Sequence, residues 1–186
     1  MAITTGITPL TGGVVLRPVT LDDAAGFARA YTRSRDHLRP TEPDRSEEFF
    51  TERGQADRIR DLLAQREAGR TVLWALAAGD DIAGAITLSN VTLGPLRSAN
   101  VGYWVDAGHV GRGLAALATE RVCQAADAEL GLHRLEAGTL LDNVASQRVL
   151  AKCGFEEYGL ARQFLYINGA WRDHRLFERI LNDRQP

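Results

Sequence analysis

The stretch from Tyr103 to Glu120, YWVDAGHVGRGLAALATE, joins an apolar strand end, a glycine-rich turn and a long helix. Gly111 and Gly113 carry no side chain that would block an approaching anion. The first amides of a helix lack internal acceptors, and the helix dipole adds partial positive charge to them. The sequence therefore predicts that the amides of residues 110–115 bind a phosphate or pyrophosphate, with Arg112 as a countercharge.

Two other phosphate-binding motifs and one purely structural explanation compete with this interpretation. GRGLAA, residues 111–116, fits the G-x-G-x-x-A spacing of dinucleotide-binding folds. Those folds need repeated strand–helix–strand units, whereas the strands before Tyr103 read as a meander. No G-K-[ST] is present, so a P-loop is excluded. The remaining alternative is that the glycines only let a turn and a helix pack closely.

Upstream of this stretch, the pattern predicts a strand, two helices and then three strands. The turn signals Gly79-Asp80-Asp81 and Gly94-Pro95 separate the three strands, which indicates an antiparallel meander. The expected elements are a strand at 13–19, a helix at 20–34 capped by Thr20, a loop at 36–46, a helix at 47–68, and strands at 71–77, 82–93 and 99–105.

Downstream of the glycine-rich turn, the pattern predicts two more helices and three strands. The apolar positions Leu114, Ala118, Val122 and Ala125 recur at helical spacing. The expected elements are a helix at 111–130, a strand at 133–140, a helix at 143–152 capped by Asn143, and a hairpin of strands 160–167 and 171–180 around Asn168-Gly169. This order indicates a mixed α/β (α+β) domain with about seven strands and about four helices.

Composition limits the classes of partner. The chain has 186 residues, 45% of them hydrophobic, with a net charge of −2. That length suits one domain, expected at 13–183 after a lead-in at 1–12. The balanced charge argues against nucleic acid or a membrane surface as partner. Two cysteines, Cys123 and Cys153, fit buried thiols in a reducing, cytoplasmic compartment. The N-terminus does not read as a secretion signal, and no apolar run is long enough to span a bilayer.

Several segments are similar to motifs of one enzyme family. VGRGLA, residues 110–115, follows GYWVD and resembles the acyl-CoA pyrophosphate loop of the GCN5-related N-acetyltransferases (GNAT). LDNVASQRVLAKCGFEEYG, residues 141–159, is similar to their N-x-x-S-x-x-V-L-x-K-x-G-F segment. The tail at 160–181 and HLRPTEP at 37–43 resemble the branch of RimJ- and RimL-type ribosomal-protein N-terminal acetyltransferases. The resemblance covers residues 14–181.

This resemblance implies a sheet that splays in its middle and an enzyme that moves an acetyl group directly from acetyl-CoA to a primary amine, without a metal. The pantetheine arm would follow the third meander strand, which would leave the next strand at Val105, and backbone N–H groups near Trp104 and Val105 would stabilise the oxyanion. Many relatives carry Gln or Arg where this chain has Val110, but the contacts there are mostly through the backbone. The expected acetyl-CoA contacts are Trp104, Val105, Val110, Gly111, Arg112, Gly113, Leu114, Ala115, Asn143 and Ser146.

The catalytic residues that the resemblance implies have structural alternatives. Ser146 would protonate or stabilise the departing thiolate, and Asn143 would hold the pantetheine; a plain N-cap followed by an exposed serine is the alternative. The general base stays open. Glu42, in a proline-rich loop, is the leading candidate, and a solvated loop acid is its alternative. Asp106 can instead cap its loop, and His109 reads as a packing or loop residue.

Three polar strand residues are candidates for the acceptor cleft. Asn90, Tyr103 and Tyr166 can line such a cleft or be ordinary strand residues with satisfied polar ends. The polar cluster at 171–174 is explained by strand alternation, and no further metal ligands accompany it.

The acceptor and the assembly stay open at this level. An N-terminal α-amine has a pKa of roughly 8 against roughly 10.4 for lysine, so it is the easier nucleophile near neutral pH. A small-molecule amine is equally open. A catalytically silent acyl-CoA-binding regulatory module and a nucleotide-binding oxidoreductase are alternative functions. A homodimer that pairs the meander with the terminal hairpin is a further open alternative.

Overall fold

The computed structural model describes residues 6–185, and eight strands there form one sheet in the order β1-β2-β3-β4-β5-β6-β8-β7. All neighbouring strands pair antiparallel except β5 and β6, which pair parallel. The mixed α/β prediction and the antiparallel meander are confirmed. The strands are β1 (Thr8–Pro9), β2 (Val15–Pro18), β3 (Val72–Ala78), β4 (Asp81–Thr92), β5 (Ser98–Val105), β6 (Arg134–Leu140), β7 (Glu156–Ile167) and β8 (Ala170–Ile180).

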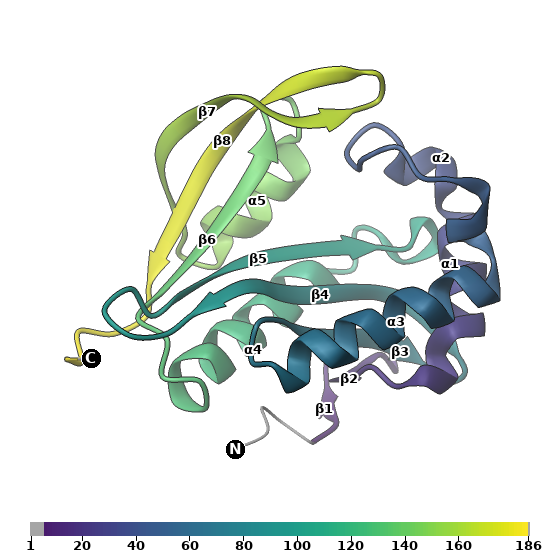
Figure 1. The fold of residues 1–186 in the computed structure, drawn as a ribbon, viewed down its shortest axis with the longest axis horizontal. Coiled ribbons are helices and arrows are strands. Elements are labelled where there is room, and N and C mark those ends of the chain that lie inside the picture. The colour runs from purple at the N-terminus through teal and green to yellow at the C-terminus, as the bar shows by residue number, and fades with distance from the viewer. Residues whose placement is uncertain (1–5, 186) are drawn as a thin grey trace.

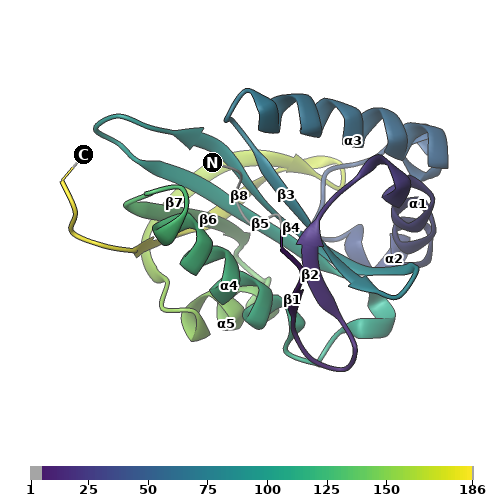
Figure 2. The ribbon, with the colours of Figure 1, turned by 90° about the horizontal axis from the view of Figure 1, so that it is seen from below.

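Helices cover the sheet on both faces, with α1 and α3 on one side and α4 and α5 on the other (Figure 1 and Figure 2). Five α-helices and three short 3-10 helices occur in the described chain. They are α1 (Ala24–Arg33), α2 (Arg35–Leu38), α3 (Glu52–Glu67), α4 (Leu114–Ala128) and α5 (Val144–Lys152), with η1 (Leu21–Asp23), η2 (Glu47–Phe50) and η3 (Ala107–His109). No helix among these residues is long and apolar enough to cross a membrane.

The two faces of the sheet bury two separate hydrophobic cores. Alternate residues of a strand point to opposite faces, so Tyr103 packs with the α4 side and Trp104 with the α1 side. The α4–α5 core draws residues from both halves of the sheet, including Leu135 and Phe177. The α1–α3 core contains no described residue of β6, β7 or β8. The four apolar positions predicted for α4 are all buried, as are both cysteines.

The sheet splits between β5 and β6. Their pairing is confined to Ser98–Asn100 against Arg134–Glu136. Beyond it, β5 stays paired with β4 as far as Val105, and β6 stays paired with β8 as far as Leu140. The splay is therefore present, but it begins after Asn100 and not at Val105 as the sequence had indicated, because each strand follows its own antiparallel neighbour from that point.

Several expected boundaries are wrong for local reasons. The helix predicted at 47–68 is broken at Thr51, which is extended (φ −93°, ψ 155°) and whose hydroxyl accepts the Gly54 N–H to start α3. The helix predicted at 111–130 begins only at Leu114, because Gly113 has φ 75°. Residues 36–38 of the expected loop belong to α2, and Thr8–Pro9 of the expected lead-in pair with β2. Residues 1–5 of that lead-in lie outside the described chain.

Candidate active site

The loop after β5 is fastened to the end of α1 by a buried carboxylate. Asp106 accepts hydrogen bonds from Ser34 Oγ at 2.7 Å, Arg33 Nε at 2.9 Å and its own loop's Gly108 N–H at 2.9 Å. Ser34 Oγ in turn accepts the Ala107 N–H at 3.0 Å. These donors lower the pKa of Asp106 against the opposing effect of burial. Asp106 thus caps the loop, as the alternative interpretation of its position held.

The glycine-rich turn presents backbone to open space. Gly111 and Gly113 both have φ 75°, a conformation that favours glycine, and nothing lies within 4 Å of where a Cβ would stand on either. Within this described loop, backbone hydrogen bonds outside regular elements stop at His109 N–H and resume at Leu117 N–H to Gly113 O. Arg112 Nη2 donates to Gly108 O at 3.0 Å, which holds its guanidinium beside the turn. The turn and the first amides of α4 therefore suit an anion.

The strand register distinguishes the two candidate oxyanion donors. Asp106 N–H donates to Ala83 O at 2.9 Å, continuing the β4–β5 ladder. Successive N–H groups of a strand point to opposite edges, so the Trp104 N–H points to β4 and the Val105 N–H points into the gap between β5 and β6. Sequence alone had assigned both groups to the same task. The ring of Trp104 instead packs in the core on the α1 side of the sheet.

Three polar residues meet across the gap on the α4–α5 side. Asn143 caps α5, and its Oδ1 accepts the Ser146 N–H at 3.1 Å. The Tyr103 hydroxyl lies 2.9 Å from Ser146 Oγ and donates to Ser146 O at 3.2 Å. Burial raises the pKa of Tyr103 to about 12. Tyr103, predicted for the acceptor cleft, therefore lies with Ser146.

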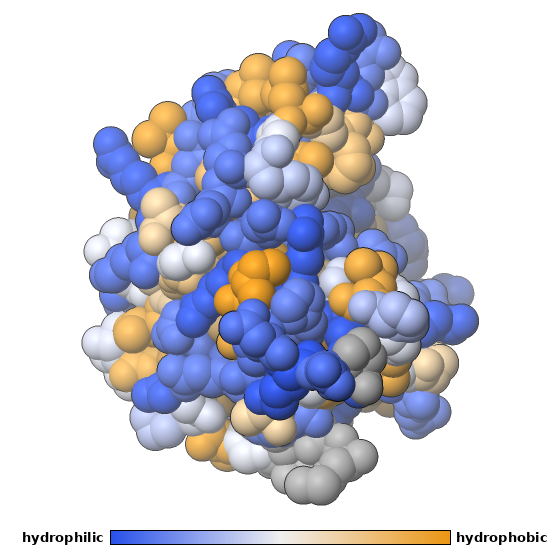
Figure 3. Space-filling view, turned by 90° about the vertical axis from the view of Figure 1, so that its left-hand side faces the viewer, coloured by the Kyte–Doolittle hydropathy of each residue, from blue (hydrophilic) through white to orange (hydrophobic). Residues whose placement is uncertain are grey.

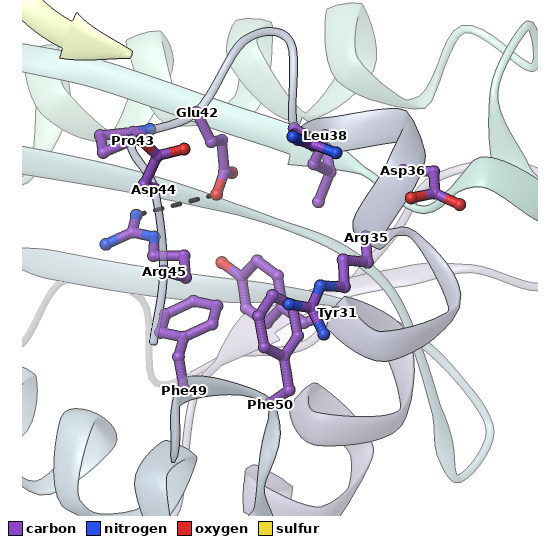
Figure 4. A pocket seen from close by; sticks show the side chains of 11 residues that line it. Tyr31, Arg35, Asp36, Leu38, Glu42, Pro43, Asp44, Arg45, Phe49 and Phe50 are labelled. Carbon is purple, nitrogen blue, oxygen red and sulfur yellow. Dashed lines mark ion pairs between the residues drawn. The ribbon is translucent and has the colours of Figure 1, made fainter. Parts of the chain in front are cut away.

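A pocket of about 320 Å³ opens on the other side, between α1, α2, η2 and the loop that joins α2 to η2 (Figure 4). Its aromatic floor continues into the sheet, because Tyr31 packs edge-on against Phe49 at 4.7 Å and lies tilted against Trp104 at 4.3 Å between ring centroids. The pocket is lined by Tyr31, Arg35, Asp36, Leu38, Arg39, Glu42, Pro43, Asp44, Arg45, Phe49 and Phe50. Tyr31 lines the pocket and packs against Trp104, so the pocket lies next to the end of β5.

Glu42 is one of three acids that line this pocket, with Asp36 and Asp44 (Figure 4). Its side chain is 22% exposed, and its carboxylate lies 3.7 Å from Arg45 Nη2, a weak pairing that leaves it available (Figure 4). Burial raises the pKa of Glu42, while Arg45 and Arg58 oppose the shift. Arg45 also stacks on Phe49 at 4.6 Å. A carboxylate with a raised pKa in a cleft is suited to accept a proton near neutral pH.

The tip of the β7–β8 hairpin reaches the loop of the pocket (Figure 1). The Gly169 N–H donates to Asp44 Oδ2 at 3.3 Å. Tyr166, near this tip, is half exposed and packs edge-on against Trp171. Asn90 does not line the pocket: it has φ 53° at an irregularity of β4 opposite the start of β5. Roles for these two residues in acceptor binding stay predictions.

The aromatic half of the pocket escaped the sequence analysis. Tyr31, Phe49 and Phe50 belong to α1 and η2, and only the packing of these two elements brings them together. The available signal was the Phe49-Phe50 pair next to the proline-rich loop that holds Glu42.

Comparisons with known proteins agree with this geometry. The acetyltransferase (GNAT) domain model matches residues 14–156. The probable N-acetyltransferase YjcK of Bacillus subtilis is 33% identical over 91% of this chain and 94% of its own. The crystal structure of the ribosomal-protein-S5-alanine acetyltransferase of Vibrio fischeri superposes with a TM-score of 0.92 at 32% identity, covering 97% of this chain and 100% of its own. The structure of Mycobacterium smegmatis RimJ in complex with CoA-disulfide superposes with a TM-score of 0.88 at 34% identity, covering 94% of this chain and 85% of its own.

These relatives favour an enzyme over the silent binding module. The chain belongs to the acetyltransferase (GNAT) family, in its RimJ/RimL-type branch, and is an enzyme that transfers an acetyl group from acetyl-CoA to an amine.

Proposed function

We propose that this acetyltransferase acts on the free N-terminal α-amine of a protein or peptide. The observation that carries the proposal is the contact of Tyr31, which lines the acid-bearing pocket, with Trp104 near the end of β5. The similarity to an S5-alanine acetyltransferase supports a protein acceptor. An α-amine, with a pKa of roughly 8, loses its proton to a carboxylate base far more easily than a lysine of roughly 10.4.

On the donor side, the amides from Val110 to Ala115 hold the pyrophosphate, with Arg112 as a countercharge. The Val105 N–H, which faces the gap, donates to the thioester carbonyl and stabilises the oxyanion. Asn143 contacts the pantetheine, and the Ser146 hydroxyl faces the leaving sulfur. The open turn of Gly111 and Gly113 and the partial exposure of Ser146 support these roles.

On the acceptor side, Glu42 accepts the proton of the attacking amine, directly or through one water. In its charged form Glu42 also attracts the ammonium group of the incoming N-terminus. That ammonium group displaces Arg45, which lies 3.7 Å from the Glu42 carboxylate. The raised pKa of Glu42 predicts that kcat/KM falls as the pH drops through that pKa, because the protonated carboxyl cannot act as a base.

The test is thiol release from acetyl-CoA with two peptides of one sequence. One peptide has a free N-terminus; the other is blocked at the N-terminus and offers only an internal lysine. We expect turnover with the first and little with the second. Equal rates, or turnover only with small amines, would contradict a peptide α-amine as the acceptor.

The base is tested with Glu42→Gln, which should lower kcat by roughly 10²–10⁴-fold and remove the acidic limb of the pH profile. Glu48→Gln is the matched control, because this exposed acid lies close in sequence but does not line the pocket. An unchanged acidic limb in Glu42→Gln would assign the base elsewhere.

A further inference from the structure

Tyr31 carries a hydroxyl proton that no described residue accepts. The residue lies on α1 and is only 3% exposed, yet it lines the pocket, and Figure 4 shows its hydroxyl pointing to the side where Glu42 and Arg45 lie. Within residues 6–185, no group accepts a hydrogen bond from this hydroxyl. A polar group that is buried without a partner costs free energy, so one at the floor of a pocket indicates a partner that enters the pocket from outside.

The Tyr31 hydroxyl stays protonated near neutral pH and can therefore act as a donor. Burial raises the pKa of Tyr31; Arg58 and Arg45 oppose that rise, and Glu42 adds to it. The indole N–H of Trp104, whose ring lies 4.3 Å away between centroids, is only a donor and cannot take the phenolic proton. The proton is thus left for a group in the pocket.

The charges around this hydroxyl favour an oxygen atom over an ammonium group as its partner. Arg58 and Arg45 both act on the hydroxyl, against the single acid Glu42. The Arg58 guanidinium lies over the rings of Tyr31 and Phe49, 5.9 and 5.8 Å from their centroids. Its Nη1 is buried with no hydrogen-bond partner among the described residues. Such a positive environment attracts the negative end of a carbonyl dipole and repels a further cation.

We propose that Tyr31 is a specificity-determining residue, whose hydroxyl donates to the carbonyl oxygen of the acceptor's first residue while Glu42 faces the α-amine of that residue. This inference rests on the proposed function. In a peptide, only the Cα and the carbonyl carbon separate the α-nitrogen from that oxygen, so one pocket can hold both groups. A lysine side chain has no carbonyl at this spacing from its amine. The two groups together therefore recognise an α-aminoacyl unit and not an isolated amine.

The test combines two enzymes with two peptides. The peptides share one sequence with a free N-terminus, and in one of them a trans-alkene replaces the first peptide bond, which removes the carbonyl oxygen and keeps the shape. With the ordinary peptide, Tyr31→Phe should lower kcat/KM by roughly 3–10-fold, the range expected for one hydrogen bond. With the alkene peptide, the same substitution should change kcat/KM by less than about twofold.

Two further measurements show that the substitution acts on the acceptor alone. KM for acetyl-CoA should stay unchanged in Tyr31→Phe, and so should the midpoint of urea unfolding, because no described residue accepts the hydrogen bond that is removed. Tyr158→Phe, which removes the hydroxyl of an exposed tyrosine of β7, is the matched control and should leave turnover of both peptides unchanged.

The outcomes distinguish this inference from the proposed function. If the unaltered enzyme does not acetylate the ordinary peptide, the proposed function fails and the inference fails with it. If it does, equal losses with both peptides, or no loss in Tyr31→Phe, overturn the inference alone. Each loss is measured within one peptide, so the different pKa values of the two amines cancel. The two peptides are compared on one preparation of each enzyme, so an unfolded fraction cancels as well.

Discussion

The two halves of the sheet differ in how they are covered. The half from β2 to β5 lies between two cores, and all but the last residue of β3 are buried. In the half made of β6, β8 and β7, the core on the α1–α3 side has no described member, and β7 buries only Ile167. Figure 3, viewed from the β7 side, shows mainly hydrophilic side chains with separate apolar spots.

The two halves contribute different groups to the candidate active site. The covered half carries β5, the Asp106 loop and the aromatic floor of the pocket, so it fixes the backbone groups that must not move during the reaction. The open half carries Ser146 and the hairpin tip. It shares the α4–α5 core with the covered half, and around the site the two halves meet through the short parallel pairing, Tyr103 to Ser146, and Gly169 to Asp44. The packed backbone groups of β5 and the Ser146 side chain that approaches them thus lie on opposite sides of the split.

The largest expected effect tests the covered half through a buried ring. Phe27 is fully buried on α1 and packs edge-on to Trp104 at 6.3 Å between ring centroids. Phe27→Ala should lower the free energy of unfolding by about 3–5 kcal/mol, because a cavity opens in the α1–α3 core. Phe164→Ala, on β7 where the ring is 45% exposed, should cost roughly 1 kcal/mol or less. Equal costs in urea unfolding would break the comparison.

A matched pair of glycines tests how tightly the backbone of the covered half is packed. Gly84 has φ 152°, and a Cβ there would stand 2.4 Å from Trp104 O. Gly84→Ala should cost roughly 2–3 kcal/mol and weaken acetyl-CoA binding, since β4 must move away from β5 beside Val105. Gly102→Ala on β5 is the control, because nothing lies within 4 Å of its Cβ position. If Gly84→Ala changed neither the free energy of unfolding nor acetyl-CoA binding, the backbone of the covered half would be easier to displace than its packing indicates.

Features that depend on neighbours in the sequence could be predicted, whereas features that depend on long-range packing could not. Helix α4 and the Asn143 cap were predictable, since both depend on neighbours within a few residues. The Thr51 break was not, because a helical pattern continues across it and only the capping geometry ends one helix there. The contact of Tyr103 with Ser146 was not predictable for a related reason: the two residues lie 43 positions apart, across a split whose start depends on strand pairing.

A smaller effect is expected at the carboxylate that fastens the loop. The pKa of Asp106 is lowered in the folded chain, so its stabilisation is complete above the unfolded value of roughly 3.9 and is lost as the pH falls through the folded value. Asp106→Asn should cost about 1–2 kcal/mol at neutral pH, and the difference from the unaltered protein should shrink on acidification. Asp81→Asn, which shares Arg33 but is 40% exposed, should show neither. A pH-independent cost would assign the effect of Asp106 to shape alone.

The smallest effect is expected at the hairpin tip. Asp44→Ala removes an exposed acceptor from the Gly169 N–H and should change the free energy of unfolding by about 0.5 kcal/mol at most. Hydrogen exchange at the Gly169 amide should nevertheless become faster, because the hairpin tip loses its hydrogen bond to the loop that joins α2 to η2. Unchanged exchange at Gly169 would mean that the tip is held by the hairpin itself.

The short pairing of β5 with β6 leaves one strand edge without a partner strand beyond Asn100. Unpaired edges are templates on which other chains can add by hydrogen bonding, which makes them starting points for aggregation. In the binding mode proposed for the donor, acetyl-CoA lies along β5 and fills that edge. Bound donor should then protect the fold as well as react in it, so the enzyme should resist aggregation longest in cells and storage buffers that keep its co-substrate bound.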